Sequence, residues 1–249
     1  MEQESQSFEA DEVQAERTTE LPPVLQEFAM SVISSQDRMA IELGQQNLSG
    51  QASFDCMDGR EFAQRFSAMF LAVYKPSENR VYVPNIPKKF QFQQALALGH
   101  ELTHASHEPA ARQVSQRSNL ESAEYANLKE GLTSYISELT LITIPVENEI
   151  YAQRLKEARK LKKYGGSADQ EIIAAEVNAF RHSYHRIAET LVNSVENGQQ
   201  QLLEGWFSGD LSGFEESVRL KFGDDFLEQL KGLNFKNRQD FIVSINQNS

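Results

Sequence analysis

The sequence predicts an α+β fold that is mostly helical and contains one small β-sheet. Apolar residues recur at intervals of three and four along most of the chain, as on the buried face of an amphipathic helix. β-prone residues separated by turn residues occur convincingly in one segment only, at 69–84. The chain has 249 residues, which is long enough to bury a sizeable core.

The first twenty residues differ in composition from the rest. They carry seven acidic residues against a single arginine, Arg17, which accounts for half of the formal net charge of -12. So few apolar residues cannot offset the conformational entropy that ordering would cost. We therefore predict a disordered acidic tail at 1–20 and a fold that begins near Leu21.

The other elements follow from the same patterns, in chain order. We predict helices at 24–44, 60–68, 90–107, 120–142, 147–163 and 168–196, and short helices broken by glycines over the last fifty residues. Polar connections are expected at 44–59 and 108–118, and strands at 69–74 and 81–83, with turn residues between the strands. The apolar seam of the helix at 168–196 consists of Ile173, Val177, Phe180, Tyr184, Ile187 and Leu191.

Composition also limits where the protein works and what it binds. Mean hydropathy is -0.51, and no apolar run approaches the roughly 20 residues that a membrane-spanning helix needs. The N-terminus has no signal-peptide pattern, and the single cysteine, Cys56, excludes an internal disulfide. We expect a cytoplasmic protein, or an effector or toxin exported without a cleaved signal. The negative charge and the lack of a basic–aromatic patch argue against a nucleic-acid partner.

Residues 100–104 form the pattern HExxH. His100 and His104 are four residues apart, so on a helix their side chains project from one face and can bind one ion. Glu101 lies about 100° around the helix, where it can take a proton from water without binding the metal. Cys56 is too far upstream to contribute, so the ligands are nitrogen and oxygen atoms, as in catalytic zinc sites. The alternative is a surface helix with two neighbouring histidines.

The segment 98–105 (LGHELTHA) resembles the active-site helix of the zincin metallopeptidases, and HELTHA is the spelling of thermolysin-like enzymes. The resemblance implies a small sheet over this helix, whose edge strand binds an extended substrate. We expect Val81–Val83 to be that edge strand. The prediction is then a zincin-like catalytic core at 21–145 with a helical C-terminal subdomain at 146–249 packed on it.

A third ligand must be a carboxylate from another element. Glu130 lies in LKEGLTSY (128–135), which is similar to the NEGFASY segment of the membrane-alanyl-aminopeptidase type of gluzincin, where the glutamate completes the site. We expect Gly131 to let the active-site helix come close. Glu176 is the alternative, because 176–180 is similar to the ligand helix of the prenyl-protein endopeptidases. Glu149 is a weaker candidate.

The supporting residues are less well determined by the sequence. Thermolysin-like enzymes have an aspartate four residues after the ligand glutamate, but this chain has Ser134 there, so Glu138 is a possible substitute. A donor for the oxyanion is expected from His185 or its neighbour His182, with Tyr125 as a further candidate.

Together these features predict a zinc-dependent metallopeptidase that acts on proteins or peptides, with Glu101 as general base. The aminopeptidase GAMEN-like motif is absent, which favours endopeptidase action. One alternative is a catalytically silent zincin-like module that binds zinc and acts through protein–protein interaction. Another is a helical interaction protein with an accidental HExxH. The sequence makes no prediction of oligomeric state.

Overall fold

The computed structural model describes residues 20–113, 118–161 and 164–248. Over these residues the chain forms helices and one three-stranded sheet, which confirms the predicted α+β, mostly helical fold. The predicted acidic tail falls outside the described residues, except for Glu20. Among the helices described, none has both the length and the apolar character that crossing a membrane requires.

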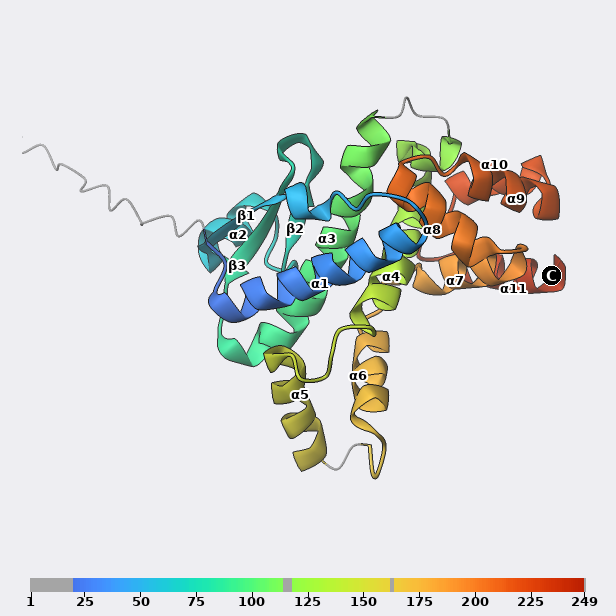
Figure 1. Cartoon of the computed structure of the whole chain (residues 1–249). Helices are drawn as coiled ribbons and strands as arrows, with labels where there is room; N and C mark the ends of the chain where they lie inside the picture. The colour runs from blue at the N-terminus through green and yellow to red at the C-terminus, as the bar shows by residue number, and fades with distance from the viewer. Residues whose placement is uncertain (1–19, 114–117, 162–163, 249) are drawn as a thin grey trace, which may run out of the picture.

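The elements follow one another through short connections (Figure 1). The strands are β1 (Ser53–Asp58), β2 (Val73–Lys75) and β3 (Arg80–Asn85). The helices are α1 (Pro23–Glu42), α2 (Gly59–Arg65), α3 (Gln91–Gln113), α4 (Ala126–Leu141), α5 (Glu149–Lys160), α6 (Asp169–Asn178), α7 (His185–Ser194), α8 (Gly198–Ser208), α9 (Ser212–Phe222), α10 (Asp224–Lys231) and α11 (Arg238–Asn248).

The sheet has the order β1-β3-β2, with β1 parallel and β2 antiparallel to β3. The prediction that Val81–Val83 is the edge strand is therefore wrong, because β3 is central. Both faces of β3 are covered: Val81 and Val83 belong to the core that contains α1 and α3, and Tyr82 packs with Phe62 of α2. A run buried on both faces is typical of a central strand. The second neighbour of β3 is β1, which lies within the segment 44–59 that the sequence predicts to be a polar connection.

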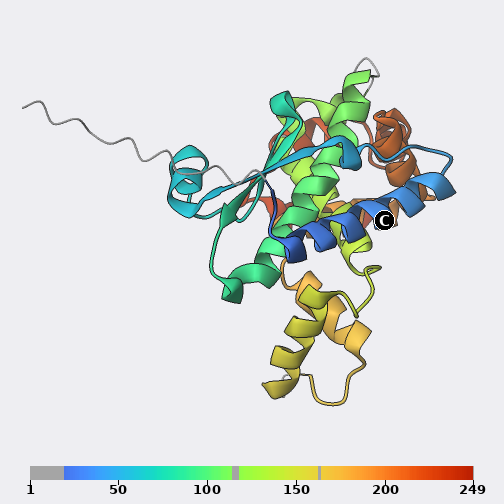
Figure 2. The same cartoon turned by 60° about the vertical axis from the view of Figure 1, so that its left-hand side comes forward.

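The helix that carries HExxH, α3, lies between the sheet and α4, and α1 crosses both helices (Figures 1 and 2). α3 and α4 approach closely at Gly99, where an added Cβ would lie 2.8 Å from the Leu141 side chain. Gly131 does not have the predicted role. An added Cβ at Gly131 would lie 2.6 Å from the carbonyl oxygen of Tyr184, so this glycine admits the turn before α7 rather than α3.

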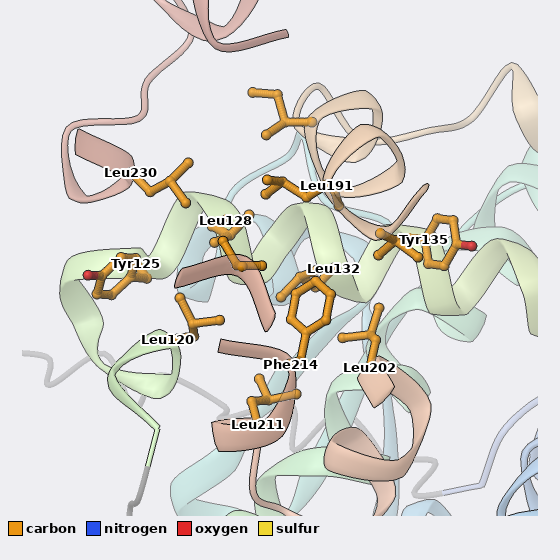
Figure 3. Close-up of a cluster of buried hydrophobic side chains, with 14 of the residues drawn as sticks. Leu120, Tyr125, Leu128, Leu132, Tyr135, Leu191, Leu202, Leu211, Phe214 and Leu230 are labelled. Carbon is orange, nitrogen blue, oxygen red and sulfur yellow. The ribbon is translucent and has the colours of Figure 1, made fainter. Parts of the chain in front are cut away.

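Two hydrophobic clusters hold the molecule together. One joins the sheet to α1, α3, α5 and α6 and includes Phe28, Leu98 and Tyr151. The other joins α4 to α7–α11 around Trp206, and Figure 3 shows part of it with Tyr125 at one end. Because α4 contributes side chains to both clusters, it packs against both the HExxH helix α3 and the C-terminal helices.

The predicted single helix at 168–196 is wrong in one respect: it is two helices, α6 and α7, separated by a turn at 179–184. Contacts with α4 account for the break, because the Ser134 hydroxyl accepts a hydrogen bond from the His182 backbone N–H at 3.1 Å. The neighbouring Tyr184 carbonyl abuts Gly131. The break turns residues 180–183 toward the cleft described below. α5 and α6 project together from the body (Figure 2).

Candidate metal centre

His100, Glu101 and His104 lie partly buried on the flank of α3 that lines the cleft described below. The opposite flank is anchored by fully buried apolar residues, including Leu98, Leu102 and Ala105. The two histidine rings are one helical turn apart, with centroids separated by 4.9 Å. The amphipathic pattern of the helix therefore directs both imidazoles to the same side, as the spacing predicted.

Glu130 of α4 reaches both histidines. Its two carboxylate oxygens lie 3.3 Å from the Nε2 atoms of His100 and His104, one oxygen to each ring. These three residues form a group whose ligand atoms all lie within 4.8 Å of one another, so it could hold a metal ion. Atoms bound at 2.0–2.1 Å in a tetrahedral site are about 3.3–3.4 Å apart. Each of the two nitrogen–oxygen separations has this value, and the whole group lies within 4.8 Å.

A hydroxyl orients one of the rings. The Thr133 Oγ1 lies 3.3 Å from Nδ1 of His104 and also donates to the Lys129 carbonyl at 2.9 Å. Such a contact on the far nitrogen directs Nε2 toward the metal position. Thr133 is three residues after Glu130 and thus on the same face of α4, a spacing from which the sequence could have indicated it. The sequence pattern instead indicates Ser134 and Glu138 as hydrogen-bond partners of a ligand histidine.

Glu130 and His104 stabilise each other's charged forms. Burial opposes ionisation of Glu130, but its hydrogen bonds with His100 and His104 outweigh this effect and hold the pKa of the carboxyl well below its usual range. Burial also works against the protonated form of His104, yet the bond to Glu130 raises the pKa of that ring above its ordinary value. A metal cation bound at this point would supply the positive charge opposite Glu130 that the proton on His104 otherwise supplies.

Glu101 lies beside this group but points to the sheet. Its Oε2 accepts a hydrogen bond from the backbone N–H of Tyr74, on the free edge strand β2, at 2.7 Å. Burial raises the pKa of Glu101, and the nearby His104 and His100 partly counteract that rise. No residue-type pattern could have revealed Tyr74, since it contributes a backbone atom.

The metal-binding group lies where two halves of a cleft meet. One half, of about 510 Å³, is lined by His100 and by apolar residues from 69–72, α3, α4 and α6. The other half, of about 520 Å³, is lined by His104 and by residues around β2. Phe70, Glu101, Glu130 and His182 line both halves. The candidate metal-binding group therefore borders both halves.

His182 is brought to the cleft, whereas His185 and Tyr125 are not among the residues that line its two halves. The His182 ring stacks near that of His100, with centroids 6.3 Å apart. His185 is buried, and its Nδ1 lies 3.2 Å from the Ser134 hydroxyl. Tyr125 is buried in the cluster of Figure 3. The turn between α6 and α7 explains the difference, because it orients residue 182 outward and residue 185 inward.

The other candidate ligands lie elsewhere. Glu176 is buried and accepts hydrogen bonds from Arg154 at 2.6 and 3.0 Å, and a third from the hydroxyl of Tyr164. Glu149 begins α5 and accepts a bond from Gln153 at 2.8 Å. Neither belongs to the group of possible metal ligands found among the described residues.

Glu138 does not contact a histidine of the metal-binding group. It forms a two-pronged ion pair with Arg181, and it lies 3.3 Å from Nε2 of His185. Both Glu138 and Arg181 line the apolar half of the cleft. The pair thus adds two polar side chains, whose charges neutralise each other, to the lining of that half.

Comparison with known proteins found no match: no family model, no curated protein and no solved structure matches the chain. Function is therefore inferred from the geometry of the site itself.

Proposed function

We propose that the chain is a zinc-dependent metallopeptidase that cleaves within polypeptides. The observation that carries the proposal is the convergence of His100, His104 and Glu130: one Glu130 oxygen lies 3.3 Å from each Nε2 atom, and the ligand atoms all lie within 4.8 Å of one another. Two histidines and one carboxylate leave a coordination position open, as in catalytic rather than structural zinc sites. When bound, zinc would polarise the scissile carbonyl and lower the pKa of water.

Glu101 is the proposed general base. Its carboxylate is adjacent to both histidines along α3 and lines both halves of the cleft, so it can accept a proton from the attacking water and pass it to the leaving amine. A purely structural zinc site has no need of a carboxylate at this position. The presence of Glu101 therefore favours catalysis over the silent zinc-binding module.

His182 is the proposed oxyanion donor, in place of His185 and Tyr125. Its Nδ1 accepts a hydrogen bond from the Tyr184 backbone N–H at 3.4 Å, so the neutral ring carries its proton on Nε2. Burial lowers the pKa of His182, which keeps the ring neutral near pH 7. A neutral Nε2–H that faces the cleft can donate to the oxygen that develops negative charge during attack.

The substrate is proposed to be a protein or peptide that occupies both halves of the cleft. The cleft continues on both sides of the metal-binding group, which suits cleavage within a chain rather than at its end. Its lining includes apolar residues on each side, among them Leu71, Leu96 and Val177 in one half and Phe66 and Val73 in the other. These would accept side chains that flank the scissile bond.

The test uses three single variants of the full chain. We expect the wild-type protein to bind about one zinc ion per chain and to generate new termini in a peptide library, identified by mass spectrometry. Glu101→Gln should fold and bind zinc but lose cleavage. Glu130→Gln should lose zinc, whereas Glu176→Gln should retain zinc and serves as the matched control. Cleavage by Glu101→Gln at the wild-type rate would refute the mechanism, and zinc-independent cleavage would refute the metal assignment.

A further inference from the structure

Glu101 is held by the sheet as well as by its own helix. The backbone N–H of Tyr74 donates to its Oε2 at 2.7 Å, a normal length for a charge-assisted hydrogen bond. Glutamate has three rotatable side-chain bonds, and fixing them costs conformational entropy. A donor on a rigid strand therefore restricts where this carboxylate points.

The register of β2 agrees with this hydrogen bond. Tyr74 lies opposite Val81 of β3, and its neighbours Val73 and Lys75 lie opposite Tyr82 and Arg80. In an antiparallel pair, successive residues direct their N–H groups alternately toward and away from the partner strand. Because the Tyr74 N–H points to Glu101, those of Val73 and Lys75 point toward β3.

From this geometry we infer that the Tyr74 backbone N–H is a positioning group for Glu101, so that the edge strand β2 directs the proposed catalytic base. This inference depends on the proposed peptidase function. It also changes what the edge strand offers to a substrate. β2 ends at Lys75, and the next residue, Pro76, has no N–H. With the Tyr74 donor engaged by Glu101, the edge has little capacity to pair with an extended chain, and the cleft walls must contribute most of the binding.

The sharpest test removes only the N–H. Replacing Tyr74 with its α-hydroxy acid analogue converts that amide to an ester and keeps the side chain, whose hydroxyl bonds to Asn79 at 2.9 Å. We expect kcat to fall about tenfold to a hundredfold, the range for one hydrogen bond to a charged group. KM and zinc content should not change, because neither depends on the orientation of Glu101.

The matched control is the same ester substitution at Lys75. It removes a donor that faces β3 rather than Glu101, so we expect lower stability with unchanged kcat. A genetic version compares Tyr74→Pro with Tyr74→Ala: both lose the aromatic ring, but only proline also loses the N–H. The proline variant should have the lower kcat. Proline is tolerated on edge strands where its missing N–H points away from the partner.

A second readout does not depend on activity. In the zinc-loaded protein the Tyr74 amide proton should resonate downfield, and in Glu101→Ala it should move upfield and exchange at least about tenfold faster with solvent. An amide that is unaffected by Glu101→Ala would overturn the inference.

The kinetic result separates the two proposals. Wild-type kcat in the Tyr74 ester variant would refute the positioning role and leave the peptidase assignment intact. A wild-type protein that binds zinc but cleaves no peptide would refute the proposed function, and the positioning role with it.

Discussion

Gly131→Ala tests how the metal-binding side of α4 is packed. The added methyl carbon would lie 2.6 Å from the Tyr184 carbonyl oxygen, 3.1 Å from its carbonyl carbon and 3.2 Å from its Cβ. An ordinary contact begins at 3.4 Å, so the turn before α7 must move by about 0.8 Å. The obstacle is backbone, which cannot rotate aside as the end of a side chain can.

The expected cost follows from two opposed effects. Overpacking of a fitted interior costs about 1–3 kcal/mol, whereas alanine is favoured over glycine within a helix by about 1 kcal/mol. Because the obstacle is backbone, the overpacking cost should lie in the upper part of this range, at about 2–3 kcal/mol, which leaves a net loss of about 1–2 kcal/mol in the free energy of unfolding. For a chain of 249 residues this lowers Tm by about 2–8 °C. The displaced turn also carries His182, and a shift near 1 Å can reduce kcat/KM about a hundredfold.

Gly99→Ala is the matched control. It also replaces a glycine within a helix, but its added carbon meets the end of the Leu141 side chain at 2.8 Å, which can change rotamer. Its free energy of unfolding should change by less than about 0.5 kcal/mol, because the helix preference offsets a small repacking cost. Urea unfolding of both zinc-loaded variants measures the difference. If Gly131→Ala is as stable as Gly99→Ala, the close approach of α4 to this turn is not a constraint.

Three further changes have expected outcomes. Thr133→Val removes the hydroxyl beside Nδ1 of His104, and zinc affinity measured by competition with a chelator should fall about 10- to 100-fold; an unchanged affinity would show that this contact does not orient the ring. Arg154→Met removes the guanidinium hydrogen bonds to the buried Glu176 and should cost about 2–3 kcal/mol in urea unfolding without loss of zinc; loss of zinc would instead connect Glu176 to the metal centre. Burial lowers the pKa of His107 from 6.5 to about 4, so the neutral ring stabilises the fold above pH 6.5 and this contribution is lost as pH falls toward 4. In metal-free protein, His107→Gln should reduce the stability lost between pH 7 and 4.5 by about 2 kcal/mol, and an equally steep loss in the variant would contradict the assignment.

The sequence alone determined the elements whose pattern is local. HExxH within an apolar helical repeat places two histidines on one flank of α3 whatever surrounds it, because the helix repeats every 3.6 residues. α1, α3, α4 and α5 could be predicted for the same reason. The sequence also identified Glu130, since a glutamate beside a glycine on the next long helix has both the reach and the chemistry of a ligand.

Only the tertiary structure decided what depends on distant segments. β1 has few apolar residues, so the sequence does not predict it as a strand. Its pairing with β3 nevertheless makes Val81–Val83 central and leaves β2 as an edge strand. The seam at 168–196 predicts one helix, but contacts of Ser134 and Gly131 break it and exchange His185 for His182 at the cleft. Periodicity reports which residues are buried, but it does not report which partner buries them. For that reason the candidate metal ligands could be predicted, while the Tyr74 N–H beside Glu101 and the residues that line the cleft could not.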